Sequence, residues 1–105
     1  MITYRQALQK GLQKPIRNKP YLNYIASLPC VVCGCEPAGE AHHIIDVGYG
    51  GMGTKASDLW VFPLCRIHHT WLHDDVKKFE ERWGTQWEYV ALAIHQAITD
   101  KVLDL

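Results

Sequence analysis

The sequence predicts an α+β domain in which a strand, a glycine-rich loop, a second strand and a helix follow one another, with further helices on either side. Three observations lead to this fold class. Residues 40–45 and 59–64 can form short strands, and four glycines lie between them. From residue 66 onward the apolar side chains have helical spacing. Paired cysteine and histidine spacings stand at the two ends of this unit, as a metal clip would require.

Length and composition indicate one globular domain. The chain has 105 residues, of which 48% are hydrophobic, and a core of that size gains much from a stabilising metal. No apolar run reaches the roughly 18 residues of a membrane helix, and the first residues lack a signal-peptide pattern. We therefore expect a cytoplasmic protein without membrane contacts.

Charge is unevenly distributed along the chain, although the formal net charge is zero. Residues 1–35 contain five cationic side chains and no acidic one, whereas the remainder is acidic. We predict a basic arm at residues 1–20, followed by the domain at residues 21–105. Such an arm suits contacts with nucleic-acid phosphates, for which Arg17 and Lys19 are candidates, while a solvated tail is the alternative.

Prolines and glycines divide the first half of the chain. Residues 1–13 favour a short helix and residues 14–20 a proline-containing linker. Residues 21–28 have helical spacing, which stops at Pro29. The glycines of residues 48–58 predict a loop, which serves as a flexible connector or brings its backbone and Lys55 to a phosphate.

Helices dominate the second half. Apolar spacing predicts a helix from Arg66 to Trp83, ended by Gly84. A capping box of Thr85 and Glu88 opens a last helix to about Val102. Its apolar stripe is predicted to contain Trp87, Val90, Ala91, Ile94 and Ile98. We expect the tryptophans to fill the core rather than to stack on bases.

Three of the four cysteines and one histidine have the spacing of a structural zinc site. Cys30 and Cys33 are separated by two residues, as in a zinc knuckle, and Gly34 can take the positive φ of the required turn. Cys65 and His68 repeat that spacing further along the chain. We predict that these two pairs form a Cys₃His zinc site that clips the strand–loop–strand unit together.

The remaining cysteine, Cys35, is predicted to be a spare that could replace Cys33. Disulfides are not expected, because the chain has no secretory signal and three of its four cysteines lie within six residues.

Five of the six histidines fall in two short stretches. On a helix, His69 and His73 share one face, whereas His68 is rotated by roughly 100° towards the cysteines. Adjacent His42 and His43 point to opposite sides of a strand, so one of them can join His69 and His73 at a metal. Three imidazoles with an open position are typical of a catalytic metal site, and the fourth histidine is then a candidate general base.

The pattern "CxxC…HHI…D-L…PLCxxHHxxxH" at residues 30–83 resembles the HNH endonucleases, the ββα-metal finger family. The stretch "AHHIIDVGYGGMGTKASD" and the segments "PLCRIHH" and "FEERWGTQWE" further resemble small phage and prophage HNH proteins, including the RecA-dependent nuclease (Ref) type. The resemblance extends from Tyr21 to Leu103. It implies a zinc-stapled HNH finger with flanking helices and a basic N-terminal arm.

The resemblance also implies roles for single residues. His43 matches the general base, and the ligands of the catalytic divalent ion match His42, His69 and His73. Asp58 stands where the family usually has an asparagine that orients the base histidine. This departure leaves two interpretations open, because the carboxylate could hold the imidazole or cap the local loop.

The implied function is metal-dependent hydrolysis of DNA phosphodiester bonds in a bacterial host cell, in recombination or DNA processing. The ion polarises the scissile phosphate and stabilises the departing oxygen. Three nitrogen ligands suit Zn²⁺, Ni²⁺ or Mn²⁺ better than Mg²⁺. Implied partners are DNA, with Arg66 as a further phosphate contact, and a recombinase filament. The alternative is a non-catalytic zinc-binding adaptor for DNA or protein. A third possibility is a metal-stabilised phage structural or packaging component.

Overall fold

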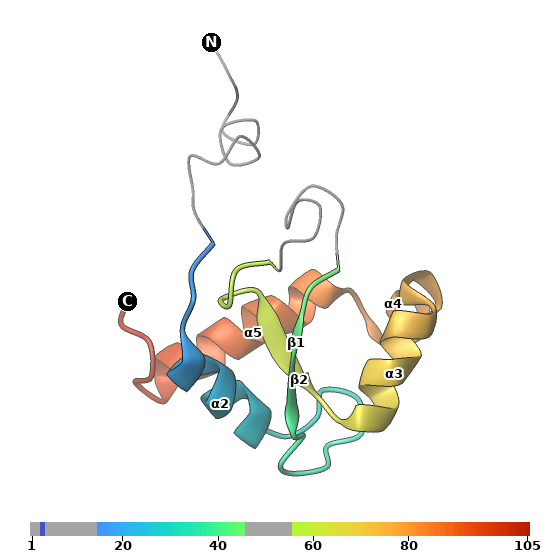
Figure 1. Ribbon diagram of the computed structural model, residues 1–105, viewed down its shortest axis with the longest axis horizontal. Helices are drawn as coiled ribbons and strands as arrows, with labels where there is room; N and C mark the ends of the chain where they lie inside the picture. Colours follow the sequence, from blue (N-terminus) through green and yellow to red (C-terminus); the bar gives the residue numbers. More distant parts are fainter. Residues whose placement is uncertain (1–2, 4–14, 46–55) are drawn as a thin grey trace.

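A two-stranded antiparallel sheet lies at the centre of the fold (Figure 1). The computed structural model describes residue 3 and residues 15–45 and 56–105. Strand β1 (Glu40–His43) pairs with β2 (Val61–Leu64), and His42 lies opposite Phe62 in this register. Both strands fall within the predicted segments but are shorter. All residues of β2 are buried, because helices α2 and α5 pack against this strand.

Helix α2 (Lys19–Ser27) precedes the sheet and packs against both strands. The side chain of Asn18 caps it by accepting a hydrogen bond from the Tyr21 amide. Pro20 lies in the first turn, where a helix tolerates proline because that amide would have no partner. The helix therefore begins inside the predicted linker, two residues before the spacing of apolar residues suggested. It buries Tyr21 and Ile25 against the sheet.

The helix predicted at residues 66–83 is interrupted, and in this respect the prediction was wrong. Helix α3 (Arg66–Asp74) and helix α4 (Val76–Trp83) are separated by Asp75, whose backbone is extended at φ −158° and ψ 93°. The Asp75 carboxylate accepts a hydrogen bond from the amide of Lys78 and so caps α4. Aspartate competes for backbone amides in this way, which makes it a helix breaker in mid-sequence. Gly84 ends α4 with φ +113°, at the predicted position.

Helix α5 (Gln86–Thr99) crosses behind the sheet (Figure 1). Thr85 caps it as predicted, since its hydroxyl accepts a hydrogen bond from the Glu88 amide. The predicted apolar stripe was wrong for Trp87 and Ala91, which are exposed, whereas Val90 is buried as predicted. The buried face consists of Gln86, Val90, Ala93 and Ala97.

The core lies between the sheet and the surrounding helices. Tryptophan contributes less to it than expected, since Trp71 and Trp87 are exposed at the surface. Among the described residues, no helix is long and apolar enough to cross a bilayer. The largest fully buried apolar side chains are those of Tyr21, Phe62, Phe79, Ile25, Leu64, Leu72, Val61 and Val90.

Residues 16–18 bind to the body of the domain, although they belong to the predicted arm. The Asp58 amide donates to the carbonyl oxygen of Ile16 over 2.8 Å, and the Ile16 amide donates to the Ser57 hydroxyl over 3.2 Å. Most of the predicted arm, and the predicted helix at residues 1–13, lie outside the described residues apart from Thr3.

Candidate functional site

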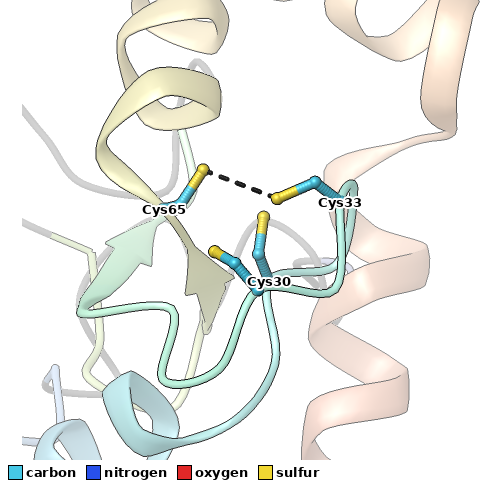
Figure 2. A group of neighbouring side chains, drawn as sticks. Cys30, Cys33 and Cys65 are labelled. Atoms are coloured by element: carbon cyan, nitrogen blue, oxygen red, sulfur yellow. Dashed lines mark hydrogen bonds between the residues drawn. The ribbon is translucent and has the colours of Figure 1, made fainter.

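Four cysteine sulfurs meet between the turn at residues 30–35 and the junction of β2 with α3 (Figure 2). The Sγ atoms of Cys30, Cys33, Cys35 and Cys65 all lie within 4.8 Å of one another, and those of Cys33 and Cys65 are 3.8 Å apart. Two backbone hydrogen bonds of 2.9 Å close the turn, from Gly34 to the Cys30 carbonyl and from Cys30 to the Cys35 carbonyl. Four thiolates at this separation can hold a zinc ion tetrahedrally.

The fourth member of this group differs from the predicted one. Sequence spacing pointed to His68 and left Cys35 as a spare, but the sulfur of Cys35 belongs to the group. Gly34 adopts φ +75°, and this left-handed residue turns the chain back so that Cys35 returns to the same point. The Nδ1 atom of His68 lies 3.1 Å from the Cys65 sulfur, and its ring packs edge-on against Trp83.

The thiols influence one another strongly. Hydrogen bonds from the backbone and side chain of Cys35 lower the pKa of the Cys33 thiol. The same contact raises the pKa of Cys35 to about 12, and burial raises that of Cys65. The Cys33 thiol therefore ionises before Cys35, and its charge disfavours the ionisation of Cys35. A divalent cation removes this repulsion, because it stabilises several thiolates together and releases their protons.

A second group of donors consists of three imidazoles. One ring nitrogen from each of His42, His69 and His73 lies within 4.8 Å of the other two. His42 is on β1 with only 1% of its surface exposed, and the other two are one turn apart on α3, which packs against the sheet. The Nε2 atoms of His69 and His73 are 3.1 Å apart. These are the three histidines that the resemblance assigned to one metal.

His42 has a buried nitrogen without a hydrogen bond. Its Nε2 atom is 2.9 Å from the side-chain oxygen of Gln86, whereas Nδ1 has no hydrogen-bond partner among the described residues. Burial lowers the pKa of His42 to about 3, so the ring is neutral and keeps a lone pair. Because a buried, unpaired nitrogen is costly, a ligand at Nδ1 would relieve that cost. The donor set therefore fits a divalent metal ion.

Glu40 holds His69 from behind. Its Oε1 atom is 2.7 Å from Nδ1 of His69, which leaves Nε2 of that ring facing His73. Metal-binding histidines commonly give their second nitrogen to a carboxylate in this way, which fixes the ring and its tautomer. Glu40 lies two residues before His42, so the period of a strand places both on one face. The same carboxylate is 3.6 Å from the exposed guanidinium of Arg66.

His43 faces the other way and pairs with Asp58. The Nε2 atom of His43 lies 2.7 Å from Oδ1 of Asp58, while the Asn18 amide donates to Oδ2 over 2.8 Å. Burial opposes ionisation of Asp58, but these two hydrogen bonds and the charges of His43 and Arg17 lower its pKa overall. Of the two interpretations of Asp58, the one in which it holds the imidazole therefore agrees with the geometry.

The predicted phosphate contacts have different surroundings. Arg17 lies beside the His43 pair, because its Nη1 atom donates to the Ala56 carbonyl over 2.8 Å and is 3.5 Å from Oδ1 of Asp58. Lys19 is exposed at the start of α2, and Arg66 is exposed at the start of α3. Lys55 lies outside the described residues.

Comparison with known proteins identifies the family but no activity. Residues 6–100 match the family described as "Protein of unknown function (DUF968)". The chain belongs to this family. It is also 47% identical over 83 residues to the uncharacterized protein YdfU of Escherichia coli (strain K12). That match covers 79% of this chain but 24% of YdfU, so the chain spans about a quarter of the relative's length. No solved structure matches the chain.

Proposed function

We propose that this protein is a metal-dependent DNA endonuclease of the HNH type. The observation that carries the proposal is the arrangement around β1, where neighbouring residues serve two different purposes. His42 contributes a ring nitrogen to a group with His69 and His73 and has a buried Nδ1 without a hydrogen bond, while His43 is held by Asp58 on the other side of the strand. A structural metal site would not require the neighbouring pair of His43 and Asp58.

The two donor groups suit two different ions. Four thiolates leave no coordination position free, as in sites where zinc only stabilises the fold. Three imidazoles leave at least one position for water or substrate, as in catalytic sites. We assign structural zinc to the cysteines, and a divalent cation that accepts nitrogen ligands, such as Zn²⁺, Ni²⁺ or Mn²⁺, to the imidazoles. Mg²⁺ is the less suitable ion.

Asp58 determines which nitrogen of His43 can act as a base. The ionised carboxylate can only accept, so Nε2 of His43 is the donor in their 2.7 Å hydrogen bond. The lone pair of the neutral ring is then on Nδ1, and this atom would take the proton of the attacking water. When bound, the metal would polarise the scissile phosphate and stabilise the leaving oxygen.

Charge supports a polyanionic substrate. Arg17 lies beside Asp58, at the edge of the proposed catalytic pair, and belongs to the stretch of residues 1–35 that has cations but no acids. Cations at this place can contact phosphates on either side of the bond to be cleaved. DNA as the substrate, a recombinase filament as a partner and action in the bacterial cytoplasm are proposals that come from the resemblance to phage and prophage HNH proteins.

The proposal is tested by plasmid cleavage after chelation, with Mg²⁺, Mn²⁺, Ni²⁺ or Zn²⁺ added back. We expect metal-dependent nicking or linearisation, and a loss of about 10²–10⁴-fold for His43→Ala, the usual contribution of a general base. His95→Ala is the matched control, because His95 is exposed on α5 and belongs to neither donor group. DNA binding without cleavage by any of these ions would favour the adaptor function instead.

A further inference from the structure

Gln86 connects helix α5 with the imidazole group. It is the first residue of the helix, and only 4% of its surface is exposed. Its Oε1 atom lies 2.9 Å from the amide nitrogen of Ile45 and 2.9 Å from Nε2 of His42. Its Nε2 atom donates to the Ile45 carbonyl over 2.8 Å. The side chain thus bridges the end of β1 and one of the proposed metal ligands.

Ile45 fixes the orientation of the Gln86 amide. The backbone of Ile45 offers one donor, its N–H, and one acceptor, its C=O, and here they face Oε1 and Nε2 of the glutamine respectively. A flipped amide would place two donors together at one end and two acceptors at the other. Oε1 therefore remains an acceptor towards His42, so the donor in that contact has to be Nε2–H of the histidine.

We propose that Gln86 is a positioning residue that holds His42 in the tautomer with the proton on Nε2, and thereby keeps the Nδ1 lone pair available to the group with His69 and His73. This role rests on the proposed metal site. Glu40 holds His69 in a similar way, but there the acceptor is a carboxylate on β1, whereas here it is a neutral amide on helix α5. Docking of α5 therefore prepares the ligand before any metal arrives.

Residue choice at position 86 follows from this role. The buried face of α5 otherwise consists of Val90, Ala93 and Ala97, so a polar side chain here departs from the apolar pattern. A leucine or methionine would fill the space but would leave the N–H and C=O of Ile45 and the Nε2–H of His42 without this partner. Glutamate keeps an oxygen that can accept from the Ile45 amide and from His42, but it loses the donor to the Ile45 carbonyl.

The test uses the zinc-loaded protein and two measurements that do not depend on cleavage. The ¹⁵N shifts of the His42 ring report its tautomer, and competition with a chromophoric chelator gives the affinity for Ni²⁺. We expect a single Nε2–H tautomer in the original protein and in Gln86→Glu. In Gln86→Met we expect the ring shifts to move towards tautomer averaging and the Ni²⁺ affinity to fall by roughly 10–100-fold.

Thr85→Ala serves as the control for a merely structural effect. It removes the cap of α5 without touching His42, so ring shifts and Ni²⁺ affinity should stay close to their original values. An Nδ1–H tautomer in the original protein would overturn the inference, as would original ring shifts and affinity in Gln86→Met. If Gln86→Met does not fold, loss of the Nε2–H tautomer in folded Gln86→Glu would also overturn it. Failure of the metal site itself would appear separately, as a Ni²⁺ affinity that His73→Ala leaves unchanged.

Discussion

His43 donates through Nε2 to Oδ1 of Asp58 over 2.7 Å, on the side of β1 opposite to its neighbour His42. Fifteen residues separate the partners in sequence, and the carboxylate is itself held by the Asn18 amide. Such a carboxylate has little freedom to turn away. The imidazole is thereby fixed in both orientation and tautomer.

Substitution of Asp58 should separate charge from orientation. Asp58→Asn keeps an oxygen that can accept a hydrogen bond from His43. Asparagine is also the usual residue here in the HNH endonucleases that the sequence resembles. We therefore expect cleavage within about tenfold of the original. Asp58→Ala removes the acceptor and should reduce cleavage towards the roughly 10²–10⁴-fold loss expected of His43→Ala. Single-turnover plasmid nicking at saturating metal measures both. Equal activity of the alanine and asparagine variants would show that Asp58 only caps its loop.

His73→Ala should impair metal binding rather than chemistry. The group of His42, His69 and His73 loses one of its three nitrogen donors. We therefore expect weaker binding of Mn²⁺ or Ni²⁺, and cleavage that excess metal partly restores. Excess metal should not restore cleavage by His43→Ala, because His43 does not belong to the group of metal donors. Titration of both variants with Mn²⁺, with nicking and metal stoichiometry as readouts, distinguishes them. Rescue of His43→Ala by metal would reverse the assigned roles.

The cysteine group predicts opposite effects for Cys35 and His68. Cys35→Ser removes one of the four sulfurs and should strongly weaken zinc binding. Loss of a residue that only hydrogen-bonds to a metal ligand costs roughly 10–100-fold in affinity, and loss of a ligand itself should cost more. His68→Ala should leave zinc bound. Cobalt substitution provides the measurement, since the intensity of sulfur-to-metal charge transfer reports the number of thiolates. Zinc retained by Cys35→Ser and lost by His68→Ala would restore the Cys₃His assignment.

Acid should destabilise the protein through His42. Its pKa is near 6.5 in the unfolded chain and about 3 in the fold, because burial disfavours the charged ring. The unfolded state therefore binds the additional proton, and stability falls as pH drops below 6.5, by about 1.5 kcal/mol between pH 6.5 and 5. The effect saturates below about pH 3. Urea unfolding measured at several pH values should show this loss of unfolding free energy in the original protein but not in His42→Gln. His95→Gln serves as the control and should lose as much as the original protein.

Local patterns in the sequence found most of the clustered donors but not the residues that surround them. Two of the donor pairs depend only on geometry within one turn, which residue order determines directly. These are Cys30 with Cys33 and, on the helix, His69 with His73. Gln86 and Glu40 could not be assigned from a pattern, because their partners come from other elements 44 and 29 residues away.

Two departures from the sequence patterns have local causes. Cys35 joins the group of four sulfurs because Gly34 takes a left-handed conformation that the two-residue spacing rule does not consider. The long predicted helix divided at Asp75, because its side chain competes for the Lys78 amide. In each case a single residue with unusual backbone preferences outweighed the periodicity around it.

Removing residues 1–14 should separate substrate binding by the arm from the structure of the domain. The truncation deletes Arg5, Lys10 and Lys14, while Arg17 and Asn18 keep their interactions with Asp58. Zinc content should therefore remain as it was. DNA affinity should fall and its dependence on salt should flatten, by about 0.9 in the logarithmic slope for each phosphate that the arm no longer neutralises. Fluorescence anisotropy of a labelled duplex between about 50 and 200 mM salt measures this slope. An unchanged slope after truncation would show that the arm does not touch DNA, and would leave Arg17, Lys19 and Arg66 as the cations to test next.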